Sequence, residues 1–257
     1  MWPEIILSSI ILSAASAIQS VVGFGLALFS VPLLVLIGVP LLPAVFIVLS
    51  VSCLSSILGV TRLKSSLQPR LTFQASLSRV VGVVPGYLAA LYTVNSSPAN
   101  LKAAMGIVIG LGVLAQSRKL FGNYASVPKG AEPDSKLAPY AFLSSGFLTG
   151  WLGMGGPPLV FWLLTGKQDP KKTRAFLSSI YVMTVPFQLA LMAYHNPQTV
   201  TTALPILIFA VPACLWVTTH FLKLGDRLDV DKLQKLSLAL LTILSAKALY
   251  DWYSIVA

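Results

Sequence analysis

A long apolar run is interrupted by the sequence Gly150-Trp151-Leu152-Gly153-Met154-Gly155-Gly156-Pro157-Pro158-Leu159. Glycine permits turns and close approaches of the backbone that other residues cannot make. Proline donates no backbone hydrogen bond, but it fits the first turn of a helix. The glycines followed by prolines therefore predict that one helix ends here and another begins. At membrane depth such a break must be buried in protein or line a wet cavity, which makes it a candidate binding site. The alternative is a glycine-rich packing contact between helices.

The composition around this stretch is that of an integral membrane protein. Of the 257 residues, 56% are hydrophobic and only 10% are charged, whereas a soluble domain is about 25% charged. Long continuous apolar runs favour spanning helices over alternating strands. Cys53 and Cys214 lie in apolar runs without metal-ligand spacing and are expected to be buried thiols. The sequence has no recognisable zinc, phosphate-loop, dinucleotide or nucleophile-elbow motif, so we expect no enzyme, no cofactor or metal, and no nucleic acid partner.

The apolar segments divide into two kinds. Most have the 20–25 residues of a spanning helix, at 41–62, 71–92, 98–117, 172–195, 198–222 and 232–255. The runs 3–38 and 138–166 are too long for one helix, and each carries a Gly/Pro break, at Gly23-Phe24-Gly25 with Pro32 and at 153–158. A hairpin or a pair of short helices fits both runs. We interpret the first run as retained, because Glu4 stands where a cleaved signal peptide, the alternative, would carry lysines.

Positive charges predict the orientation of the chain. Apart from Arg79, Lys102 and Lys247, the 18 lysines and arginines gather in the stretches 62–70, 118–136, 167–174 and 223–235. The turns 93–98 and 195–198 contain neither residue type. Cytoplasmic loops are rich in Lys and Arg, so the four basic stretches are expected inside and the two neutral turns outside. We therefore expect a multi-pass protein of the inner or plasma membrane with both termini external.

This orientation makes the two halves opposite in direction, as in the inverted repeats of many transporters. Ordered matches between the halves support a duplication. They are Gly23-Phe24-Gly25 with Gly153-Met154-Gly155, Val84-Pro85 with Val211-Pro212, and Leu101-Lys102 with Leu233-Gln234. The expected fold is an all-α polytopic membrane protein of two inverted-topology repeats, each a Gly/Pro-broken first segment plus three spanning helices. The expected domains are membrane repeats at 1–117 and 138–257, joined by a cytoplasmic loop at 118–137.

With these motifs in place, the chain resembles the sulfite exporter TauE/SafE family of membrane permeases. The resemblance covers nearly the whole chain and rests on the stretch 150–159, Gly23-Phe24-Gly25…Pro32-Leu33, Pro85-Gly86 and Leu224-Gly225-Asp226-Arg227. One departure is Leu26-Ala27, where many relatives have more glycine. The resemblance implies a plasma-membrane transporter of small, often sulfur-containing anions such as sulfite, sulfonates or sulfoacetate-like compounds.

Candidate substrate-binding residues cluster at the two breaks. A helix N-terminus exposes unpaired N–H groups and about half a positive charge, which favours anions. Gly153, Gly155, Gly156 and Pro157 would supply this end at the second break, and Gly23 and Gly25 would form the opposite wall. Four polar or charged candidates in apolar helices complete the predicted site: Gln19, Thr149, Gln188 and Arg79. Gln19 and Thr149 precede the two breaks at equivalent positions, where they line a cavity or bond between helices.

Arg79 is the most informative of the charged residues. It lies roughly 12 Å into the segment 71–92, where an arginine costs a few kcal/mol unless it faces protein or water. Its planar fork suits sulfonate or carboxylate oxygens, and the alternative is a side chain that snorkels to the inner surface. We interpret Lys171, Lys172 and Arg174 as determinants of topology. Lys247 and Asp251 form an i,i+4 pair that is either structural or proton-coupling.

Together these features predict a secondary transporter that moves a small anion through the bilayer by alternating access. Protons or the membrane potential are the candidate driving forces. The alternatives are an anion channel or uniporter, and a transporter of another small organic anion. An intramembrane enzyme is disfavoured because the carboxylates lie nearly all at the ends of the apolar segments. The sequence indicates no oligomeric state.

Overall fold

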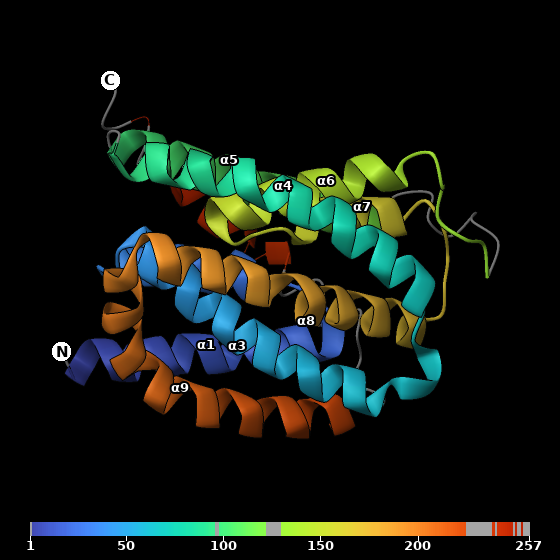
Figure 1. The fold of residues 1–257 in the computed structure, drawn as a ribbon, viewed down its shortest axis with the longest axis horizontal. Coiled ribbons are helices and arrows are strands. Elements are labelled where there is room, and N and C mark those ends of the chain that lie inside the picture. Colours follow the sequence, from blue (N-terminus) through green and yellow to red (C-terminus); the bar gives the residue numbers. More distant parts are fainter. Residues whose placement is uncertain are drawn as a thin grey trace. The chain divides into compact units, whose positions relative to one another are not determined.

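The computed structural model describes residues 2–95, 98–121, 130–224, 238–239, 241–248, 250 and 253. These residues form helices and connecting turns, without a strand among them. In chain order the elements are α1 (Trp2–Val22), α2 (Leu26–Leu36), α3 (Leu41–Arg62), the short 3-10 helix η1 (Lys64–Ser66), α4 (Pro69–Asn95), α5 (Pro98–Phe121), α6 (Ala138–Leu152), α7 (Gly156–Leu163), α8 (Pro170–His195) and α9 (Pro197–Leu224) (Figure 1).

Five of these helices are long and apolar enough to cross a membrane: α1, α3, α4, α8 and α9. Their outer faces carry large apolar side chains that would be anomalous in water, for example Ile10 at 60%, Val81 at 60% and Trp216 at 65% exposure. Such contiguous apolar surface is expected where lipid replaces water as the solvent. The prediction of an all-α polytopic membrane protein is therefore confirmed.

Both anomalous apolar runs are broken into two helices. The run 3–38 becomes α1 and α2, and the run 138–166 becomes α6 and α7. α2 has 11 residues and α7 has 8, which at 1.5 Å per residue leaves each too short to cross a hydrocarbon core of about 30 Å. The helix α2 continues through Pro32, so the glycines end the preceding helix and the proline does not.

The local reason for each break is a glycine in the left-handed region of backbone space. Gly23 has φ 95° and Gly153 has φ 74°, values that cost an L-residue with a side chain about 1–2 kcal/mol. α6 ends with Gly153 N–H bonded to the Thr149 carbonyl at 2.8 Å and Met154 N–H bonded to the Leu148 carbonyl at 3.2 Å. The Gly153 bond is the αL C-cap motif, in which the N–H of a left-handed residue just past the helix bonds the carbonyl four residues earlier. Gly23 N–H bonds the Gln19 carbonyl at 2.7 Å in the same way.

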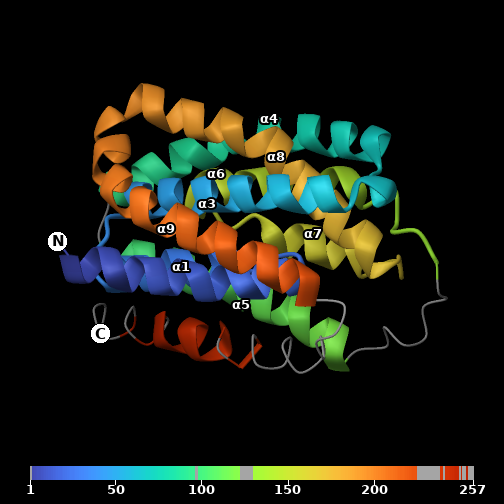
Figure 2. The ribbon, with the colours of Figure 1, turned by 90° about the horizontal axis from the view of Figure 1, so that it is seen from below.

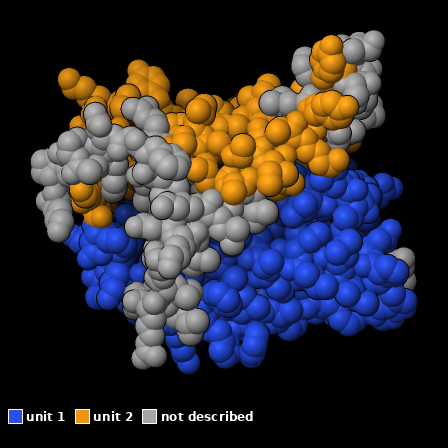
Figure 3. Space-filling view, turned by 180° about the vertical axis from the view of Figure 1, so that it is seen from behind, with its two compact units in different colours: residues 1–77, 169–230 blue, residues 78–168, 231–257 orange. Residues whose placement is uncertain are grey.

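The chain separates into two compact units (Figure 3). Unit 1 comprises residues 1–77 and 169–230, and therefore holds α1, α2, α3, α8 and α9. Within it α1 packs against α2 and α9, and α3 packs against α2, α8 and α9 (Figure 2).

Unit 2 comprises residues 78–168 and 231–257, and holds most of α4 with α5, α6 and α7. Its α4 and α6 pack through glycines on both sides. A side chain at Gly82 of α4 would collide with the Leu143 carbonyl, and one at Gly146 of α6 would collide with the Arg79 carbonyl. This small-residue packing lets two membrane helices approach closely.

Each unit draws on both predicted halves of the sequence. The division into repeats at 1–117 and 138–257 stays a prediction, because a compact unit and a sequence repeat are different properties. Of the predicted loop 118–137, residues 122–129 lie outside the described part of the chain. Half of the predicted final helix at 232–255, including Asp251 of the Lys247–Asp251 pair, also lies outside it.

Candidate functional site

The break between α6 and α7, called break 2 below, is held by buried polar side chains of unit 2. The Ser145 hydroxyl donates to the Gly155 carbonyl at 2.7 Å, across the turn. The Thr149 hydroxyl donates to the Ser145 carbonyl, also at 2.7 Å. Ser145 and Thr149 are both buried. The Ser145 bond thus satisfies a carbonyl of the turn itself in a place from which water is excluded, whereas the Thr149 bond goes to a carbonyl inside its own helix.

Arg79 of α4 is the charged group of break 2. Its Nη2 atom donates to the Thr149 hydroxyl at 2.6 Å. A Cβ atom placed on Gly155 would lie 3.0 Å from the same Nη2 atom, so the guanidinium lies directly against the turn. The side chain is 0% exposed. Arg79 therefore points into the protein, and the alternative of a side chain snorkelling to the inner surface does not describe this structure.

The start of α7 explains why a guanidinium is useful at this place. Gly155 is the N-cap, Gly156 is the first helical residue, and Pro157 and Pro158 follow. A helix N-terminus normally presents unpaired N–H groups, but the two prolines have none. The N–H donors of Arg79 thus stand beside a helix end that is poor in backbone donors.

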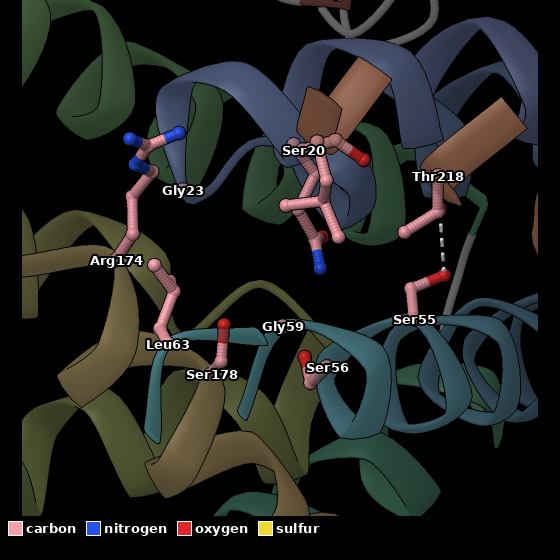
Figure 4. Close-up of a pocket in the computed structure, with 11 residues that line it drawn as sticks. Ser20, Gly23, Ser55, Ser56, Gly59, Leu63, Arg174, Ser178 and Thr218 are labelled. Carbon is pink, nitrogen blue, oxygen red and sulfur yellow. Dashed lines mark hydrogen bonds between the residues drawn. The ribbon is translucent and has the colours of Figure 1, made fainter. Parts of the chain in front are cut away.

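The break between α1 and α2, called break 1 below, borders a small cavity in unit 1 (Figure 4). The cavity volume of about 20 Å³ is enough for about one water molecule. Its lining comes from α1, α3, α8 and α9, and its main polar members are Gln19, Ser20, Ser56, Arg174, Ser178 and Thr218. The serine and threonine hydroxyls can donate or accept. Arg174 is the charged residue of this lining, which contains no carboxylate.

Most polar groups of the cavity already have a partner. The Gln19 amide donates to the Ser52 hydroxyl over a long 3.4 Å, and the Thr218 hydroxyl donates to the Ser55 hydroxyl at 3.2 Å. The Ser20 hydroxyl donates to the Ser16 carbonyl at 2.7 Å. The Ser56 hydroxyl, in a residue only 2% exposed, has no hydrogen-bond partner among the described residues. A buried hydroxyl without a partner costs about 1–3 kcal/mol, so it marks a place where water or a ligand is expected.

Helix α8 brings Arg174 to break 1. A Cβ atom on Gly23 would lie 3.2 Å from Cγ of Arg174, so the arginine stem passes across the turn that Gly23 makes. On the facing side, a Cβ atom on Gly59 of α3 would lie 2.7 Å from the Ser178 hydroxyl. Close approach at both glycines thus shapes the wall of the cavity.

The predicted site residues fall into two groups that the structure places in different units. Arg79, Thr149, Gly153, Gly155, Gly156 and Pro157 belong to break 2, and Gln19, Gly23 and Gly25 belong to break 1. Gln188 is fully buried in α8 and is not among the residues that line the cavity. That these residues contact a substrate, and that the two breaks form opposite walls of one site, remain predictions.

Sequence reasoning missed the cavity residues Arg174, Ser56 and Ser178. By sequence alone, Arg174 is interpreted as a determinant of topology. Arg174 and Ser178 are four residues apart and thus share one face of α8, whereas Lys171 and Lys172 are exposed. This spacing was a usable signal, but nothing local to α8 indicates that the face meets the end of α1.

Comparison with known proteins agrees with this architecture. Residues 8–248 match the family described as Sulfite exporter TauE/SafE. A relative from Cupriavidus necator, Probable sulfite/organosulfonate exporter TauE, is 26% identical over 182 residues. That alignment covers 68% of this chain and 66%, just under two thirds, of the relative. Because the family match extends over nearly the full length and includes both breaks, the chain belongs to the sulfite exporter TauE/SafE family.

Proposed function

We propose that this protein is a secondary transporter that moves small anions, sulfite or organosulfonates, across the cytoplasmic membrane by alternating access. Membership of an exporter family supports transport, and the name of the Cupriavidus necator relative suggests the substrate class. The observation that carries the proposal is the fully buried Arg79 guanidinium at the second helix break. Nothing in this assignment calls for an enzyme.

The chemistry of Arg79 favours an oxyanion as the partner. Burying a cation in a membrane protein is costly and is usually connected with function. The guanidinium has five N–H donors in a planar fork, and charge-assisted bonds from such a fork to anionic oxygens are about twice as strong as neutral ones. The oxygens of an SO₃ group match the spacing of this fork. An anion at break 2 would accept hydrogen bonds from the guanidinium, whose Nη2 atom also donates to Thr149.

Two broken helices fit a carrier better than a rigid pore. In transporters built from inverted repeats, discontinuous helices bind the solute while the repeats rock around them. Export of one negative charge from a negative interior is favoured by about 2.3 kcal/mol per 100 mV. The potential alone can thus drive export, and proton coupling would add to it. A channel or uniporter with the same lining, or a carrier for another small organic anion, is the competing proposal.

Flux in proteoliposomes tests this function. Purified protein is reconstituted with sulfite, sulfoacetate or acetate inside, and efflux is followed at imposed potentials of either sign. We expect saturable efflux of sulfite or sulfoacetate that an inside-negative potential accelerates and that substrate on the opposite side stimulates. Single-channel currents without such stimulation would favour the channel. Correctly folded protein that moves none of the sulfur oxyanions would overturn the proposal.

The membrane orientation is part of the proposal. Reporter fusions at Gly130 and Lys167 should be active in the cytoplasm, and fusions at Ser96 and at the C-terminus should be active outside. These sides follow from the basic stretches. A cytoplasmic reporter signal at Ser96 would reverse the orientation and place the cavity of break 1 at the external side.

A further inference from the structure

We propose that the cavity at break 1 is a second oxyanion-binding subsite, in which Arg174 and Ser56 bind the anion. The inference rests on the proposed function, since it assigns this subsite the same class of ligand, a small oxyanion such as sulfite or a sulfonate. It assigns Arg174 a role in binding rather than in topology. It is argued from unit 1 alone.

The first argument is the chemistry of the lining. Hydroxyls from α1, α3, α8 and α9 surround a space of about 20 Å³, and the charge in the lining is that of Arg174. A metal cation would be repelled by this arginine, and the lining offers no carboxylate to coordinate one. Hydroxyl donors and a guanidinium together are a set that suits anionic oxygens.

The second argument is the Ser56 hydroxyl. It is buried, it has no partner among the described residues, and it points into the cavity (Figure 4). Burial without a partner is unfavourable by itself. The cavity admits a group the size of one water, so one oxygen of the anion occupies it beside Ser56. Arg174, whose stem passes across the turn at Gly23, supplies positive charge at the same cavity.

The third argument is access. Leu63, Arg174 and Leu222 are partly exposed, and they come from the end of α3, the start of α8 and the end of α9. The cavity therefore lies close to the surface at this end of unit 1. Arg62 and Lys223 near the ends of α3 and α9, and Lys171 near the start of α8, are basic residues of this end, and their charge would concentrate anions near the mouth.

The fourth argument is that glycines keep the arginine and the cavity in place. Gly23 lets the Arg174 stem cross the break at van der Waals distance, and Gly59 lets α3 approach Ser178 of α8. A larger residue at either position would displace one of the proposed ligands. The positive φ of Gly23 ends α1, and the missing side chain leaves room for the stem of Arg174 beside the break.

Equilibrium binding tests the subsite separately from transport. Sulfite and sulfoacetate are titrated into purified protein in a zwitterionic detergent without added lipid. Arg174→Gln should weaken binding about tenfold or more, because a charge-assisted bond is lost. Arg174→Lys should recover part of this loss, and Ser56→Ala should weaken binding about threefold to tenfold. The matched control is Lys171→Gln, which removes an exposed charge from the same turn of α8 and should weaken binding much less than Arg174→Gln does, because Lys171 adds only diffuse charge near the mouth.

The outcomes separate this subsite from the proposed function. Sulfite flux by the wild type, with Arg174→Gln and Ser56→Ala both binding as the wild type does, would overturn the subsite and leave the function standing. If the wild type binds sulfite in a way that depends on Arg174 but shows no flux, the subsite is supported and the proposed transport function is overturned. Competition by a short-chain anionic phospholipid, with no binding of free sulfite, would assign Arg174 to lipid headgroups and overturn the proposal. If Arg174→Gln does not fold, Ser56→Ala decides the question.

Discussion

Break 1 and break 2 interrupt equivalent positions of the two predicted repeats, yet they differ in what lies beside the exposed backbone. At break 1, α2 begins with Leu26, Ala27 and Leu28, all of which keep an N–H group. At break 2, the equivalent residues are Gly156, Pro157 and Pro158, and the prolines have none. A buried arginine, Arg79, stands at break 2, whereas the partly exposed Arg174 stands at break 1.

This difference indicates that the two breaks have different roles. Break 2 is closed by side chains, since Ser145, Thr149 and Arg79 bond to one another and to the turn. Break 1 keeps a small polar cavity near the surface. Break 1 thus offers an anion hydroxyl groups beside a small cavity, whereas break 2 offers a buried guanidinium. The variants below either break this contrast or sharpen it.

The largest effect is expected from Gly155→Ala at break 2. The backbone at Gly155, with φ −76°, accepts alanine, but the space does not. The new Cβ atom would lie 2.5 Å from the Ser145 carbonyl and would collide with the Thr149 hydroxyl. We expect a loss of about 3 kcal/mol in stability, from overpacking and from the displaced Thr149 bond. Thermal denaturation in detergent, followed by size-exclusion chromatography, measures the effect.

The matched control for that variant is Gly110→Ala in α5. Its Cβ atom would make an ordinary contact of 3.5 Å with the Ser245 hydroxyl, and alanine is favoured over glycine in a helix by about 1 kcal/mol. Gly110→Ala should therefore equal or exceed the wild type in stability. A Gly155→Ala protein as stable as the wild type would mean that break 2 is not sealed as described.

The second effect is loss of transport in Arg79→Gln. A glutamine amide can still donate to Thr149, so the fold should survive while the charge is removed. We expect sulfite efflux to fall about 100-fold, the upper range for a bond to a charged group. The control is Arg70→Gln, which removes an exposed arginine at the start of the same helix. Undiminished efflux from Arg79→Gln would reduce Arg79 to a structural residue.

The orientation of Arg79 also illustrates how far the sequence can be interpreted. The helix bounds and both breaks were predictable because apolar length and the order of glycine and proline act locally; the segment 41–62 and α3 coincide. The depth of Arg79 in the membrane could be predicted from its position in the segment 71–92. The direction of its side chain could not, because it depends on which helix packs against α4. Arg79, Gly82 and Gly86 lie at i, i+3 and i+7 and so share one face. That this face meets α6 is a long-range contact that a single sequence does not reveal.

A third, smaller effect at break 1 separates the cost of backbone strain from the cost of a steric clash. Gly25 has φ 115°, but the nearest atom to a new Cβ would be Phe29 Cε2 at an acceptable 3.4 Å. Gly25→Ala should therefore cost only the backbone strain, about 1–2 kcal/mol. Gly38→Ala is the control, because Gly38 has φ 98° and nothing within 4 Å of the added atom. The two variants should lose similar stability, and only Gly25→Ala should change efflux. Equal efflux in both would separate break 1 from transport.

The smallest effect is expected at Gln19, whose predicted repeat partner is Thr149. The Gln19 amide makes a neutral, long bond of 3.4 Å to Ser52, whereas Thr149 accepts a 2.6 Å bond from a charged guanidinium. Neutral bonds contribute about 0.5–1.5 kcal/mol and bonds to charged groups about 1.5–3 kcal/mol. Gln19→Ala should thus lower efflux only about twofold, and Thr149→Ala about tenfold, at equal expression. Equal losses in the two variants would contradict the contrast between the breaks, because they would indicate that both side chains contact the anion, as a symmetric pair of sites would.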